Sequence, residues 1–127
     1  MEYVIAFRGD PEDVLVTTSG KADVDQLHRM VEDVVADPRF EPGMSVIVDH
    51  RELDVTELTS EQLRERSRRL AAESDRIGPS RVASVVGSVA AYGLWRMMDV
   101  YEEGLTEFSG GVFYTLEEAR DWLRATA

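Results

Sequence analysis

The polar residues best placed to do chemistry follow an apolar run near the middle of the chain. Asp49, His50 and Arg51 come directly after residues 46–48, which read Val-Ile-Val. A carboxylate next to an imidazole can bind a small ligand or transfer protons. Side chains alternate along a strand, so Asp49 and Arg51 should point to one side and His50 to the other. A structural use competes with the functional one, because Asp49 and Arg51 could also bond to each other and to loop backbone.

Two further polar positions should lie along the same edge of the sheet. Ser88 follows the apolar run 82–86, and Tyr114 closes the run 111–114. In open parallel sheets, ligands bind outside the carboxyl ends of the strands. No residue is expected to be catalytic. The ligand-binding candidates are Asp49, His50, Arg51, Ser88 and Tyr114.

The sequence lacks the common motifs of phosphate, metal and acyl chemistry. It contains no Gly-x-Gly-x-x-Gly, no P-loop, no His-Glu-x-x-His, no calcium-binding loop and no nucleophile elbow. It also has no cysteine, which excludes a disulfide scaffold, a thiolate metal site and a cysteine nucleophile. The two histidines, His28 and His50, do not have a metal-binding spacing. We expect no metal, no cofactor and no enzymatic activity.

Composition limits the partners and the location. The chain has 127 residues, a formal net charge of −11 and a pI near 4.5. An acidic surface repels phosphate backbones and anionic headgroups, so we expect neither nucleic acid nor a membrane surface as a partner. The length fits one domain over residues 1–127. The N-terminus has no basic leader, and no apolar stretch reaches the roughly 20 residues of a spanning helix, so we expect a cytoplasmic protein.

Strand-like and helix-like patterns alternate along the chain. Strands are predicted at 2–8, 14–18, 46–48, 82–86 and 111–114. Helices are predicted at about 24–36, 60–77, 89–103 and 116–123. The short first turn implies an antiparallel hairpin, and strands separated by a helix should be parallel with right-handed crossovers. The sequence therefore predicts an α/β fold of order ββαβαβαβα, with a mixed, mostly parallel five-stranded sheet covered by four helices.

The predicted helix 89–103 carries aromatic residues outside its expected buried face. The stripe expected to face the sheet consists of Ala90, Leu94, Met97, Met98 and Tyr101. Tyr92 and Trp95 fall outside it, and exposed aromatic residues with methionine are typical of protein interfaces. Tyr92, Trp95 and Met98 are therefore interface candidates for a protein partner or a homodimer. The alternative is a helix that is buried more deeply than usual.

Arginine is concentrated on the predicted helix 60–77, although the chain as a whole is acidic. The arginines are Arg64, Arg66, Arg68, Arg69 and Arg76, with Glu61, Glu65 and Glu73 between them. Glu65 and Arg69 have the spacing of a favourable i,i+4 ion pair. The default interpretation is a solvated, ion-paired surface. The alternative is a docking surface for an acidic partner or a second copy of the chain.

The element order, at this length, resembles the STAS family, the anti-sigma-factor antagonist domains. Several short segments of the sequence resemble a bacterial STAS-like branch of uncharacterised proteins. The residues that carry it are Ala-Asp-Pro-Arg-Phe at 36–40, Pro-Gly-Met at 42–44, Val-Ile-Val-Asp at 46–49 with 51–53, Tyr-Gly-Leu at 92–94 with 96–97, and Leu-Glu-Glu-Ala at 116–119 with 122–123. The resemblance covers nearly the whole chain. It implies the fold, which STAS domains share with lipid-carrying CRAL-TRIO domains, and it does not fix the function.

The phosphorylation switch of the STAS antagonists is altered here. In that family a phosphorylatable serine lies in an Asp-Ser-Ser/Ala-Gly motif that opens the second helix. The corresponding residues 57–60 read Glu-Leu-Thr-Ser, so the motif is absent. Thr59 remains next to a helix N-terminus, where an added phosphate would be stabilised, and it is the phosphorylation candidate. The alternative is that Thr59 only caps the helix, in a capping box with Gln62.

These observations favour a non-catalytic binding or regulatory module of STAS-like type that binds a protein partner or a small ligand. One alternative is a carrier of a small apolar ligand, by analogy with the lipid-carrying relatives. Another is a small hydrolase or isomerase that uses Asp49 and His50. A large apolar pocket would favour the carrier, a polar cleft that joins Asp49, His50 and a hydroxyl would favour the enzyme, and a flat exposed aromatic patch would favour the protein partner.

Overall fold

The chain begins with an antiparallel hairpin. The computed structural model describes residues 1–125. Strand β1 (Glu2–Phe7) pairs antiparallel with β2 (Val14–Lys21), and Ile5 lies opposite Val16. The turn between them is closed by a hydrogen bond from the Arg8 backbone N–H to the Asp13 carbonyl. The short connection between the two strands predicted this antiparallel hairpin, and the prediction is confirmed.

The other three strands join β2 in a parallel arrangement. They are β3 (Val46–Asp54), β4 (Arg81–Val85) and β5 (Ser109–Phe113). The sheet has five strands in the order β1-β2-β3-β4-β5, and every pair from β2 onward is parallel. Strands β2 and β3 run further than predicted, because their polar ends continue the ladder and Ser19 pairs with Glu52 after a register shift.

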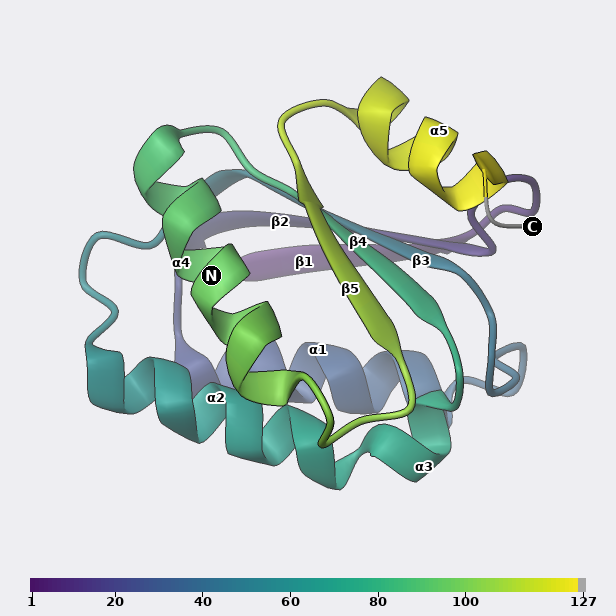
Figure 1. Ribbon diagram of the computed structural model, residues 1–127, viewed down its shortest axis with the longest axis horizontal. Helices are drawn as coiled ribbons and strands as arrows, with labels where there is room; N and C mark the ends of the chain where they lie inside the picture. The colour runs from purple at the N-terminus through teal and green to yellow at the C-terminus, as the bar shows by residue number, and fades with distance from the viewer. Residues whose placement is uncertain (126–127) are drawn as a thin grey trace.

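Helices cover both faces of this sheet (Figure 1). They are α1 (Val24–Ala36), α2 (Ser60–Ala72), α3 (Ser74–Ile77), α4 (Val89–Glu102) and α5 (Leu116–Ala125). Helices α1, α2 and α4 pack on one face, and α5 packs alone on the other. The expected fold is confirmed, with one difference: the predicted helix 60–77 breaks at Glu73 (φ −92°, ψ 4°), and the short α3 then brings Ile77 into the core.

Local sequence sets the helix starts. The side chain of Asp23 accepts a hydrogen bond from the Gln26 backbone at 2.9 Å, and this caps α1. Thr59 and Gln62 form a reciprocal capping box at the start of α2, with bonds of 3.1 and 2.9 Å. Ser88 accepts from a backbone N–H in the first turn of α4. Each cap satisfies donors that a helix start leaves without partners.

Strand alternation divides the apolar residues between two cores. The larger core lies under α1, α2 and α4 and includes Val14, Val16, Leu27, Met30, Val48 and Trp95. The smaller core lies under α5 and consists of Ile47, Ala83, Val85, Ala119 and Leu123. The two faces of β3 therefore differ, with Val48 and His50 on the side of the larger core and Ile47 and Asp49 on the other.

A buried ion pair ties the first turn to the last helix. Glu12 is 2% exposed, and Arg120 donates to its carboxylate from Nη2 at 2.8 Å and from Nε at 3.1 Å. Burial alone would raise the pKa of Glu12, but the Arg120 hydrogen bonds outweigh it and hold this pKa below its ordinary value. The contact joins residues 108 positions apart.

The orientation predicted for the third long helix is wrong. The residues of α4 that face the interior are Ala91, Trp95, Met98 and Glu102. Trp95 and Met98 are each 4% exposed, so neither can form an exposed partner surface, and Tyr92 is half-buried. The i, i+4, i+7, i+11 spacing of this set makes one continuous face, and the large Trp95 ring packs there against the His50 ring. Of the three interface candidates, Trp95 and Met98 are therefore buried inside one copy of the chain and do not support a homodimer.

Candidate functional site

The five ligand-binding candidates do not form one site. Because β3 continues through residues 49–51, Asp49 and Arg51 lie on one face of the sheet and His50 lies on the other. Ser88 caps α4. Tyr114 is 42% exposed and stacks on Tyr92, with ring centroids 4.9 Å apart. Each candidate therefore has its own local contact.

Asp49 and Arg51 satisfy each other. Arg51 donates to the Asp49 carboxylate from Nε at 2.9 Å and from Nη2 at 2.8 Å, and its backbone N–H donates to Oδ1 at 3.1 Å. Burial tends to raise the pKa of Asp49, but the Arg51 hydrogen bonds outweigh it and hold this pKa below its ordinary value. This is the arrangement expected for a structural use of the pair.

His50 is buried under the larger core. Its Nδ1 lies 2.7 Å from the Thr18 hydroxyl, which donates to the Asp49 carbonyl at 3.2 Å. Since Thr18 has one hydroxyl proton, it accepts from Nδ1–H, and Nε2 keeps its lone pair. Burial, with a smaller contribution from the Arg66 charge, lowers the pKa of His50 to about 3. The imidazole is therefore neutral at physiological pH.

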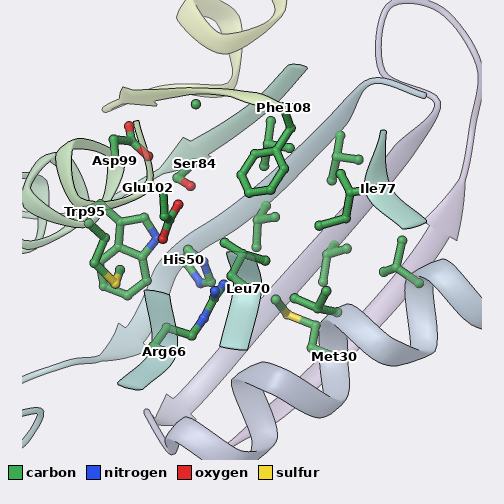
Figure 2. Close-up of a pocket in the computed structure, with 18 of the residues that line it drawn as sticks. Met30, His50, Arg66, Leu70, Ile77, Ser84, Trp95, Asp99, Glu102 and Phe108 are labelled. Atoms are coloured by element: carbon green, nitrogen blue, oxygen red, sulfur yellow. The ribbon is translucent and has the colours of Figure 1, made fainter. Parts of the chain in front are cut away.

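Next to His50 lies a cavity that the sequence did not predict. It has a volume of about 90 Å³ and lies between the sheet and helices α1, α2 and α4. Its walls are mainly apolar and include Val16, Met30, Val48, Leu70, Ile77 and Phe108. One end is polar: Figure 2 shows His50, Arg66, Ser84, Asp99 and Glu102 gathered there beside Trp95.

Arg66 is the most unusual residue of this polar end. It is 8% exposed, and its Nε is buried without a hydrogen-bond partner. Within residues 1–125 its guanidinium forms no hydrogen bond or ion pair, and only the more distant Glu102 charge compensates it. Burial of a cation without a direct partner costs several kcal/mol. The sequence had placed Arg66 on a solvated surface, and that prediction is wrong.

Two carboxyl groups from α4 complete the polar end. Glu102 is 6% exposed and accepts from the Ser67 hydroxyl at 3.0 Å, and burial raises its pKa to about 7. Burial likewise raises the pKa of Asp99 to about 6. Among residues 1–125, Asp99 Oδ2 has no hydrogen-bond partner, and Arg96 Nη1 lies 3.8 Å from it. Both groups therefore bind protons more readily than ordinary carboxyls do.

The same wall borders a second, outer cleft. This cleft has a volume of about 440 Å³ and a polar lining that includes Glu103 and Glu107. The residues that line both hollows are Asp99, Glu102, Phe108 and Gly110. A Cβ at Gly110 would lie 2.5 Å from Asp99 Oδ1, so glycine is what allows Asp99 this position. The two hollows therefore lie on either side of a shared wall.

Two other sequence candidates lie away from the cavity. Thr59 is exposed at the start of α2, where its hydroxyl caps the helix. His28 lies half-buried on α1 with Nε2 2.7 Å from Glu32, and one ligand atom each from His28, Glu32 and Glu73 lie within 4.8 Å of one another. Glu73 also pairs with Arg76 at 2.9 Å. Surface ion pairing accounts for this cluster, and we assign it no metal.

Comparison with known proteins identifies the fold. No family model and no curated protein matches the chain. Among solved structures, the chain is similar to an uncharacterised protein of the DUF3478 family from Shewanella loihica PV-4, described as having a SpoIIAA-like fold; the TM-score is 0.62, the identity is 20%, and the match covers 95% of this chain and 93% of that one. Within the described residues, no helix is long and apolar enough to cross a membrane. The chain therefore has a SpoIIAA-like fold, the STAS-like fold that its element order predicts.

Proposed function

We propose that this protein is a non-catalytic binding protein that holds a small, largely apolar molecule in the cavity beneath the sheet. The observation that carries the proposal is the cavity itself, with about 90 Å³ of space, apolar walls and a polar end. Small-molecule sites have this composition, in which apolar walls supply affinity and a few polar groups fix orientation. For scale, an apolar protein cavity of about 150 Å³ takes benzene. The ligand of this protein is smaller than benzene or makes the walls move.

The arrangement of polar groups supports binding more than catalysis. A hydrolase or isomerase that used Asp49 and His50 would need both groups to reach one reacting molecule. Here the sheet lies between them, and the Asp49 carboxylate is engaged by Arg51. The low pKa of His50, about 3, also makes it a weak base.

Methionine-methyl NMR tests the proposal directly. Met30 and Met98 line the cavity, whereas Met1 does not. A small neutral probe such as 1-propanol should shift the Met30 and Met98 signals in a saturable way and leave the Met1 signal unchanged. Absence of any saturable shift with a panel of small apolar probes would refute the proposal.

A cavity-filling variant supplies the matched comparison. Val48→Phe adds a ring to the cavity wall and should abolish the shifts, although overpacking of this kind also costs about 1–3 kcal/mol of stability. Val4→Phe makes the same change at an exposed position of β1 and should bind like the wild type. Far-UV circular dichroism of both variants checks that the sheet and helices are retained.

A further inference from the structure

We propose that the ligand of this cavity is a short-chain carboxylic acid, whose carboxylate pairs with Arg66 while its alkyl chain lies among the apolar walls. The inference rests on the proposed function and narrows it to one chemical class. It starts from the unpartnered guanidinium at the polar end of the cavity (Figure 2).

Arg66 is set apart from the other arginines that reach toward the protein interior. Arg51 and Arg120 each hold a carboxylate with two guanidinium nitrogens. Arg66 is more buried than either and has no such carboxylate. The planar guanidinium fork matches a carboxylate with two parallel hydrogen bonds. A ligand carboxylate would give Arg66 the kind of partner that Arg51 and Arg120 find in carboxylates of this chain.

Other donors at the same end are also available. Ser84 and Trp95 line the cavity beside Arg66 (Figure 2). Among the described residues, neither the Ser84 hydroxyl nor the Trp95 indole N–H forms a hydrogen bond. His50 contributes no positive charge, because it is neutral. The polar end therefore offers several donors to a group that accepts hydrogen bonds.

The two carboxyl groups of α4 set the proton balance. If both were ionised, Asp99 and Glu102 would repel a ligand carboxylate. Burial raises their pKa values to about 6 and about 7, so each accepts a proton readily and then no longer repels the ligand. The ligand can therefore enter as its neutral acid, whose O–H proton moves to the Glu102 or Asp99 carboxylate. The ligand is left as a carboxylate beside Arg66, and the total charge is unchanged. Arg96 does not line the cavity, and in the part of the chain that the structure describes its ion pair is with Asp99.

A cationic ligand head is the competing possibility. An ammonium group could bond to the free Oδ2 of Asp99. It would, however, add a second cation near Arg66 and leave that guanidinium without a partner. The acid satisfies Arg66 and, through the transferred proton, also relieves the repulsion between the two carboxyls. The volume of about 90 Å³ suits an acid with about two or three carbon atoms, which is smaller than benzene.

The test compares four compounds with the same three-carbon chain: propionate, propionamide, 1-propanol and propylamine. Binding to the full chain is followed by the methionine-methyl signals at about pH 6.5, where Glu102 is largely protonated. Propionate should bind at least about tenfold more tightly than the alcohol. Its affinity should fall as the pH rises above about 7, and the affinity of the alcohol should not.

Two arginine variants test whether Arg66 causes the preference for the acid over the alcohol. Arg66→Met should remove the advantage of propionate while alcohol binding persists, which also shows that the variant is folded. Arg64→Met makes the same change at an exposed position of α2 and should keep the advantage. If Arg66→Met does not fold, Arg66→Lys, which keeps the charge but loses the fork, should weaken acid binding alone.

The outcomes separate this inference from the proposed function. Equal binding of acid and alcohol, or an advantage of the acid that survives Arg66→Met, overturns the inference and leaves the proposed function standing. Tightest binding of the amine overturns it in favour of a cationic ligand at Asp99. Failure of all four compounds to bind removes both.

Discussion

Replacement of Glu102 by glutamine should make the protein more stable, and the gain should grow with pH. Folding raises the pKa of Glu102 from its ordinary value of 4.5 to about 7, because burial opposes its charge. The folded state therefore binds this proton more tightly than the unfolded state does. A group of this kind contributes stability at low pH and loses it as the pH rises from 4.5 toward 7.

The magnitude follows from the size of the rise. Each pKa unit corresponds to about 1.4 kcal/mol, so full ionisation of Glu102 destabilises the folded state by roughly 3 kcal/mol. About 1.4 kcal/mol of this is already present at about pH 5.5, one unit above the ordinary value. Glutamine keeps an acceptor for the Ser67 hydroxyl and has no charge. The stability difference between Glu102→Gln and wild type should therefore increase by about 2 kcal/mol between about pH 5.5 and about pH 8.

Urea unfolding followed by tryptophan fluorescence measures this difference. The series starts at about pH 5.5, because the protein has little net charge close to its pI near 4.5 and would tend to precipitate there. His50 also makes stability depend on pH in this range, because its ordinary pKa of 6.5 applies in the unfolded state while folding lowers that pKa to about 3. His50 is present in both proteins, so this contribution cancels in the difference. Glu103→Gln makes the same chemical change at the exposed neighbouring position and should show no such trend. A Glu102→Gln difference that stays flat, or that shrinks with rising pH, would contradict the burial of an ionisable Glu102.

Three further substitutions test individual contacts by urea unfolding. Arg120→Met leaves the Glu12 carboxylate buried without its partner and should lower the free energy of unfolding by about 3 kcal/mol or more; a loss below 1 kcal/mol would mean that Glu12 reaches water. Asp49→Asn should lower the free energy of unfolding by about 1–3 kcal/mol near pH 7. Because Arg51 holds the pKa of Asp49 below its ordinary value, the stability advantage of the wild type should fade as the pH drops below about 4. Thr59→Ala removes the α2 cap and should lower the free energy of unfolding by about 1 kcal/mol, whereas Thr59→Ser should not, and equal losses in both would exclude the cap as the cause.

Much of the fold could be predicted from local sequence. Helix starts at Asp23 and Thr59 were visible because a cap and its partner lie three residues apart. The parallel strands were visible because buried strands are continuously apolar. The opposite orientation of Asp49 and His50 follows from the pleat alone. These features depend on neighbours in sequence.

The polar end of the cavity could not be predicted in the same way, because its groups come from two helices, α2 and α4, and two strands, β3 and β4. A signal was nevertheless present. Arg66 lies three residues after Leu63 and four before Leu70, which places it on the apolar stripe of α2. Glu102 lies four residues after Met98 on the buried face of α4. A charged residue on an apolar stripe indicates a buried charge, and composition alone had suggested a solvated surface.

The buried pair of Glu12 and Arg120 also has a consequence for the order in which the chain can complete its fold during synthesis. Translation proceeds from the N-terminus, so Arg120 is added 108 residues after Glu12, an interval of about 5–20 seconds at typical rates. Throughout that interval the Glu12 carboxylate has no guanidinium to receive it and stays in water. The turn that carries it can therefore dock against the sheet only after α5 has left the ribosome. The turn of the first hairpin is then among the last parts of the fold to reach its native contacts.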